Sequence, residues 1–143
     1  MNKIIEFLGL KKMDDKTKLQ NKAVKLHEKG HKLIRKGKIE KGLALYQEAL
    51  IIATNIDALE VKAHALCNMA QLIANNGDFK TAFSYMEQSI EILEKLESPD
   101  LEEIITIYED IKFMEKNKEF EHMMNSPKLK EIFNDMLIKK PSN

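Results

Sequence analysis

Four side chains of the types that bind zinc occur in this chain as two pairs. His27 and His31 are four residues apart, and His64 and Cys67 are three apart, so each pair lies about one turn apart in a helix. Imidazole and thiolate suit zinc, and four such donors complete a tetrahedral site. The alternative is two unrelated surface pairs, with Cys67 as a small, partly buried hydrophobe. Because no closely spaced cysteine pair occurs, we expect no metal site and no cofactor.

His64 and Cys67 also have the types of a catalytic dyad. On one helix at this separation both side chains point outward, and no oxyanion donor accompanies them. The chain has no P-loop, no Gly-rich dinucleotide turn and no nucleophile elbow. We therefore expect a protein that is not an enzyme.

These residues lie in a sequence that repeats itself. Residues 30–50 and 70–90 correspond at a constant offset of 40, so Gly37-Lys38-Ile39 aligns with Gly77-Asp78-Phe79. A period between 20 and 50 residues is typical of a stacked array of supersecondary units. Such arrays usually present a binding surface and perform no chemistry.

Apolar residues recur at helical spacing, without sustained β-strand alternation, so the expected fold is all-α. The expected helices cover approximately residues 16–36, 39–54, 58–75, 79–95, 98–114 and 126–138, and residues 115–125 form either a short helix or a loop. Expected caps are Asp57 (with Glu60, as a capping box), Asp78, Ser98 and Ser126.

Small residues occur where the helices of each pair should cross. They are Gly30, Gly42 and Ala49 in the first copy and Ala70, Ala82 and Ser89 in the second. A glycine inside a helix costs about 1 kcal/mol relative to alanine, so close packing is the expected compensation. The repeated unit is predicted to be an antiparallel helix pair with a tight glycine turn.

This pattern resembles the tetratricopeptide repeat (TPR) family over roughly residues 20–95. The matching positions are Leu26, Gly30, Leu33, Gly37, Ile39, Gly42, Tyr46, Ala49 and Leu50, then Leu66, Ala70, Ile73, Gly77, Phe79, Ala82, Met86, Ser89 and Ile90. The family period is about 34 residues, so a spacing of 40 implies longer helices or a longer turn between repeats. The resemblance implies an α-solenoid with two TPR-like helix pairs in residues 15–97 and extra capping helices, a degenerate third repeat, in residues 98–143.

The family binds peptides in a concave groove lined by the first helix of each pair. By this resemblance the groove would present His27, His31, Arg35, His64, Cys67, Asn68, Gln71 and Asn75, beside Ile34. Asn68 matches one asparagine of the clamp with which co-chaperone members hold acidic tails. His27 and His31 replace the clamp's lysine and other asparagine, and Glu102 and Thr106 replace its basic pair, so we do not expect that ligand.

Composition is that of a single globular domain of 143 residues. Its one cysteine excludes an internal disulfide and suits a reducing compartment, so we expect a cytoplasmic protein. Net charge is zero, but residues 1–38 carry twelve Lys or Arg against four Asp or Glu, while residues 39–121 carry seven against seventeen. This asymmetry is either a solvated lysine-rich surface or a device that steers a charged partner or orders head-to-tail contacts.

The N-terminal segment, residues 1–14, contains Ile4, Ile5, Phe7, Leu8 and Leu10. It is expected to fold back over the array, or else to bind a partner or a membrane. The function that the sequence favours is a non-catalytic scaffold that holds a peptide or helix of another protein, without nucleic acid or membrane as partner. The alternatives are self-association through the C-terminal helices and nucleic-acid binding by the lysine-rich N-terminal third.

Overall fold

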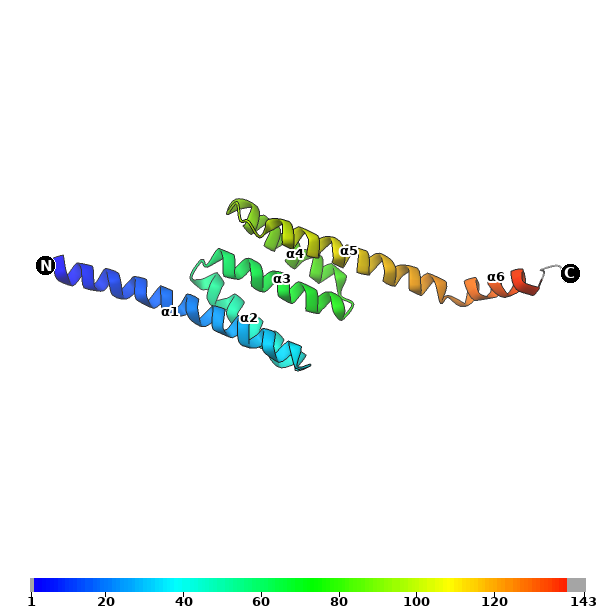
Figure 1. The fold of residues 1–143 in the computed structure, drawn as a ribbon, viewed down its shortest axis with the longest axis horizontal. Helices are drawn as coiled ribbons and strands as arrows, with labels where there is room; N and C mark the ends of the chain where they lie inside the picture. Colours follow the sequence, from blue (N-terminus) through cyan, green and yellow to red (C-terminus); the bar gives the residue numbers. More distant parts are fainter. Residues whose placement is uncertain (1, 139–143) are drawn as a thin grey trace.

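The described part of the chain is entirely helical (Figure 1). The computed structural model describes the backbone of residues 2–138 and the side chains of residues 15–132 and 134–136. This part contains no β-strand, which confirms the all-α prediction. Its helices are α1 (Asn2–Arg35), α2 (Ile39–Asn55), α3 (Leu59–Asn75), α4 (Phe79–Lys95), α5 (Leu101–Met124) and α6 (Pro127–Ile138).

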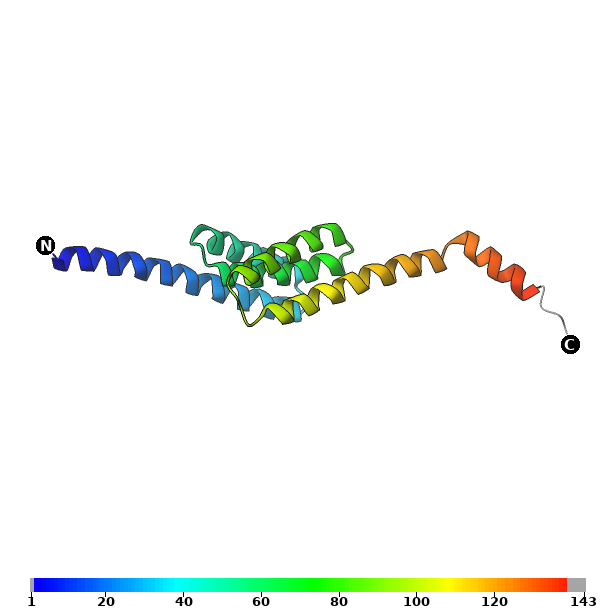
Figure 2. The same ribbon diagram turned by 90° about the horizontal axis from the view of Figure 1, so that it is seen from above.

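Each helix packs against the next one in the chain, and α3 also touches both α1 and α5. Figure 1 shows α1, α3 and α5 side by side, with α3 between the other two. Figure 2 shows that the N-terminal part of α1 and the α5–α6 segment extend from the central body in opposite directions. No helix in the described residues has the length and apolar character needed to cross a membrane.

The connections between helices follow a strict spacing. Helices α2, α3 and α4 each contain 17 residues. Gly37, Asp57, Gly77 and Glu97, which are 20 residues apart, all have positive φ angles, of 80°, 54°, 92° and 49°. In each turn the next residue's N–H bonds back to the carbonyl five residues earlier, as Lys38 does to Leu33 at 2.9 Å. The 40-residue period therefore comes from long helices joined by short turns.

Two of the expected helix caps are present. Asp78 Oδ1 accepts a hydrogen bond from the Thr81 N–H at 3.2 Å, and Ser126 Oγ accepts one from the Leu129 N–H at 3.3 Å. The capping box at Asp57 is wrong. Asp57 occupies the left-handed position of the turn, and Ala58, which precedes α3, makes no side-chain cap.

Both long outer helices differ from their expected bounds. Helix α1 begins at Asn2 and not near residue 16, and α5 runs without a break through residues 115–124. Ser98 Oγ accepts a hydrogen bond from the Asp100 N–H at 3.2 Å, and α5 begins at Leu101. The expectation that the N-terminal segment folds back over the array is wrong, because residues 2–14 continue α1 and extend away from the central body. The expected helix end at residues 139–141 lies outside the described residues.

The close crossing in the first helix pair is confirmed. A Cβ added to Gly30 would lie 3.0 Å from the Gly42 carbonyl oxygen, and one added to Gly42 would lie 2.8 Å from the Gly30 carbonyl oxygen. In the second pair Ala70 and Ala82 are fully buried. Buried Ser89 donates a hydrogen bond to the Ala63 carbonyl at 2.7 Å, which ties α4 to α3.

The main core joins α3, α4 and α5. Its buried members are Ala63, Cys67, Ala70, Ala74, Ala82, Met86, Leu93, Ile104 and Ile111. Helix α5 supplies Ile104 and Ile111, so it covers the second helix pair. Helix α6 contacts only α5 among the described helices, and it adds no buried residue to this core.

Candidate binding groove

Two adjacent clefts lie along the boundary between α1 and α3. One has a volume of about 350 Å³, the other of about 340 Å³, and both include His27, Glu28 and Asn68. The first is also lined by Gln20, Val24, Glu60, Val61 and His64, and the second by His31, Lys32 and Arg35. Because they share His27, Glu28 and Asn68, we call the two adjoining clefts together the α1–α3 groove. It brings together five of the eight predicted site residues.

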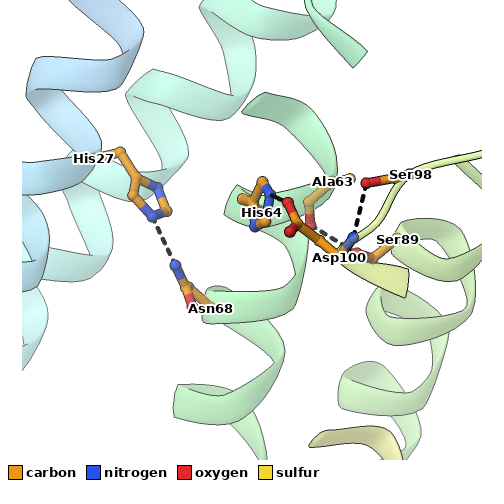
Figure 3. A network of polar contacts seen from close by, with 7 residues as sticks. All are labelled: His27, Ala63, His64, Asn68, Ser89, Ser98 and Asp100. Carbon is orange, nitrogen blue, oxygen red and sulfur yellow. Dashed lines mark hydrogen bonds and ion pairs between the residues drawn. The ribbon is translucent and has the colours of Figure 1, made fainter. Parts of the chain in front are cut away.

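A direct hydrogen bond joins the two helices at residues that line both clefts. Asn68 Nδ2 on α3 donates to His27 Nε2 on α1 at 2.6 Å (Figure 3). Gln71 Nε2, one turn further along α3, donates to Asn68 Oδ1 at 3.4 Å. This chain orients the Asn68 amide, and it fixes His27 as the tautomer with an unprotonated Nε2.

Tyr46 of α2 contacts both histidines that α1 contributes to the groove. The His27 ring stacks on the Tyr46 ring with 4.7 Å between centroids, and His31 Nδ1 is 3.1 Å from the Tyr46 hydroxyl. Burial lowers the pKa of His27 below its ordinary value, with further lowering from His64 and His31. His27 Nδ1 is buried without a hydrogen-bond partner among the described residues. These contacts favour a neutral, fixed imidazole.

Asp100, the residue that precedes α5, contacts His64 on α3. His64 Nε2 lies 3.1 Å from Asp100 Oδ2 (Figure 3). Donor atoms of Glu60, His64 and Asp100 all lie within 4.8 Å of one another. This is the one group of three potential metal ligands among the described residues, and it differs from the set of His27, His31, His64 and Cys67 that was considered and not expected from the sequence.

Cys67 does not line the groove, contrary to the prediction. Its side chain is 1% exposed and belongs to the core between α3, α4 and α5, so it cannot contact a ligand in the groove. Burial raises the pKa of its thiol to about 11. The spacing of Cys67 from His64 places the two on different sides of α3, one toward the core and the other toward the groove.

The remaining predicted residues lie at the end of the groove or beyond it. Arg35 is exposed and lines the second cleft, whereas Gln71 is half-buried and reaches the groove only through its bond to Asn68. Asn75 is exposed and lines neither cleft.

Sequence reasoning missed several groove residues. Glu28 and Glu60 follow directly from the register of α1 and α3, because each lies one turn from a predicted histidine. Tyr46 was named as a position that matches the repeat family, and its hydroxyl contact with His31 gave no sequence signal. Asp100 comes from a turn 36 residues after His64, so only the fold brings it near. The chain matches no protein-family model, no curated protein and no solved structure.

Proposed function

We propose that this chain is a non-catalytic, TPR-like scaffold that holds a peptide or helix of another protein in the α1–α3 groove. The observation that carries this proposal is the pair of adjoining clefts between the first helices of successive pairs, with polar side chains fixed by neighbouring helices. Fixed side chains reduce the entropy lost on binding. The single buried cysteine suits a reducing compartment, and we propose a cytoplasmic location.

The charges of the groove determine which kind of peptide it should bind. The second cleft carries Lys32 and Arg35, whereas the first carries Glu60, with Glu28 between them. A bound peptide is therefore expected to place an acidic residue near Arg35 and a basic residue near Glu60. From Gln20 to Arg35 the groove follows about 22 Å of helix at 1.5 Å per residue. That length fits an extended peptide of roughly six or seven residues.

Selection from a displayed library of random peptides tests this function. We expect enriched peptides to contain an acidic and a basic residue a few positions apart. Arg35→Ala and Glu60→Ala should each weaken binding at least about fivefold, as measured by fluorescence anisotropy. Gln47→Ala, an exposed position of α2 outside the groove, is the control and should leave the affinity unchanged. Failure to enrich any peptide, or full affinity in both groove variants, would contradict the proposal.

A further inference from the structure

The two outer helices of the array each have a side that no described helix covers. Helix α3 lies between α1 and α5, which do not touch each other (Figure 1). Stacked arrays need a polar cap at each end to stay monomeric, because an uncovered end is a template for another unit. The outward sides of α1 and α5 therefore decide whether copies of this chain stack.

The outward side of α1 carries a line of positive charge. Lys22, Lys25 and Lys29 are spaced three and four residues apart, so they form one row along the helix. We call this row the lysine ridge. All three are exposed, and none forms an ion pair with another described residue.

A cleft runs along the lysine ridge. A shallow cleft of about 400 Å³ lies along α1, and its lining has no carboxylate; its residues are Lys18, Asn21, Lys22, Lys25, Leu26 and Lys29. Like charges three or four residues apart on a helix repel each other. An anionic surface placed against the ridge would relieve this repulsion.

The outward side of α5 has the opposite charge. Glu102, Glu103, Glu109 and Asp110 are all exposed, and we call them the acidic face. The core side of the same helix is formed by Ile104 and Ile111, which are at most 3% exposed. Of the four acidic residues, Glu109 has a cationic partner within its own helix, Lys112 at 3.5 Å.

Apolar side chains accompany the acidic face. Ile105 is 38% exposed and Phe113 is 65% exposed. Phe113 lies eleven residues after Glu102 and four after Glu109, so it continues the same row along α5. Burial of these two side chains by a partner would be favourable, whereas exposed ion pairs alone add little.

We propose that the acidic face of one copy docks on the lysine ridge of a second copy. The occupant is a second copy because one chain carries both complementary surfaces, on opposite edges of the same array. Such a contact is heterologous: each added copy leaves one ridge and one face free, so association continues head to tail. This inference rests on the outer helices and does not depend on the groove.

Sedimentation velocity of the full chain tests the association. At low salt, about 50 mM, the average mass should rise above that of the monomer as protein concentration increases. At about 500 mM salt, where charges are screened over a few ångströms, association should weaken at least about tenfold. A chain that remains monomeric at every concentration in low salt would overturn the proposal.

Charge reversal identifies the surfaces. The double variant Lys22→Glu/Lys29→Glu makes the ridge net negative, and the double variant Glu102→Lys/Glu109→Lys cancels the net charge of the acidic face, so each should associate far more weakly than the unaltered chain. In an equimolar mixture the two variants should associate with each other, because the unaltered acidic face of the first complements the unaltered ridge of the second. Lys41→Glu/Lys80→Glu, at exposed positions of α2 and α4, changes net charge as the ridge variant does and should associate like the unaltered chain.

The variants alter exposed side chains, and circular dichroism checks that each remains helical. Association that is unchanged in either reversed variant, or a mixture of helical variants that stays monomeric, would contradict the proposal. So would a monomeric chain whose ridge binds duplex DNA, RNA or anionic vesicles and loses that binding in Lys22→Glu/Lys29→Glu. That result would assign the ridge to another class of partner.

Discussion

Each histidine of the groove is held by a residue from a different part of the chain. His27 accepts a hydrogen bond from Asn68 of α3, His31 contacts Tyr46 of α2, and His64 contacts Asp100 ahead of α5. The polar side chains of the groove therefore also connect the helices that form it. A change at one of them should affect both binding and the packing of neighbouring helices.

Cys67 should be unreactive in the folded protein. Its thiol is buried, and a pKa of about 11 instead of 9.0 leaves roughly a hundredfold less thiolate at pH 8. We expect modification by a disulfide reagent at pH 8 to be at least about a hundredfold slower in the folded chain than in the chain unfolded by denaturant. Equal rates in the two states would show that the thiol faces solvent.

His27 should make stability depend on pH. Its folded pKa is lowered, so below the ordinary value of 6.5 the unfolded chain takes up a proton that the folded chain does not. The free energy of unfolding should therefore fall as pH is lowered from 7 to 5, by at most about 1.4 kcal/mol per pH unit for this one group. Urea titrations at several pH values measure this slope.

Two histidine variants separate this effect from other titrations. His27→Gln should remove that part of the slope, whereas His122→Gln, at an exposed site on α5, should keep it. A slope that is identical in the unaltered chain and in His27→Gln would contradict the burial of this imidazole.

At the scale of single residues, the sequence predicted only part of the groove. His27, His31, Arg35, His64 and Asn68 follow from helical register and from the resemblance to the family, and the structure brings them to one groove. Tyr46 and Asp100 were not predicted because their contacts join helices far apart in the chain. Cys67 was misplaced because a three-residue step rotates a side chain far enough to move it from the groove to the core.

At the scale of helices and turns, the most regular feature is the left-handed residue every 20 positions. Glycine fills this position at residues 37 and 77 and was predicted from the sequence as a turn. Asp57 and Glu97 fill the other two, and neither is as clear a turn signal as glycine, because residues with a Cβ rarely adopt a positive φ, although Asp does so more often than Glu. The capping-box prediction at Asp57 failed for this reason.

Glu97→Gly should stabilise the chain. Glu97 has a φ of 49°, a conformation that costs a residue with a Cβ roughly 1–2 kcal/mol, whereas glycine adopts it readily. After the greater entropy of glycine in the unfolded chain is subtracted, we expect a gain of about 0.5–1 kcal/mol in the free energy of unfolding. Glu94→Gly, the same change three residues earlier inside α4, should instead destabilise by about 1 kcal/mol.

Urea unfolding of the two variants side by side gives a clear result. Opposite signs at the two positions are expected, because only Glu97 occupies the left-handed site. A loss of stability in both variants would show that the turn after α4 does not have the conformation described.

Gly42→Ala should destabilise the first helix pair. The added methyl group would lie 2.8 Å from the Gly30 carbonyl oxygen and would also contact the Ile34 side chain, so α1 and α2 must move apart. Alanine gains about 1 kcal/mol in helix propensity, but the steric cost should exceed it and give a net loss of about 1–3 kcal/mol. Thermal or urea unfolding measures the loss.

Gln47→Ala, which is exposed on the same helix, should change stability by less than about 0.5 kcal/mol. If Gly42→Ala were as stable as that control, the helices would not cross closely at Gly30.

At the scale of the whole molecule, the chain is an elongated row of helices with opposite charge at its two edges. The repeat predicted the adjacent pairs, and charge counting predicted the asymmetry between residues 1–38 and 39–121. The row of lysines and the acidic side of α5 emerged only when helical register was combined with the packing order of α1, α3 and α5. The extent of α5 was not predictable, because residues 115–124 mix polar side chains with the exposed Phe120, Met123 and Met124 and add no residue to the core.

A chemical-shift titration of the ¹⁵N-labelled chain with an enriched peptide tests the central claim most directly. We predict that the backbone amides of His27, His31, Asn68 and Gln71 shift as the peptide binds, whereas those of Gln47 and Gln88, which are exposed on α2 and α4, do not. Shifts confined to the lysine ridge or to α6, with the amides of the α1–α3 groove unchanged, would contradict the account.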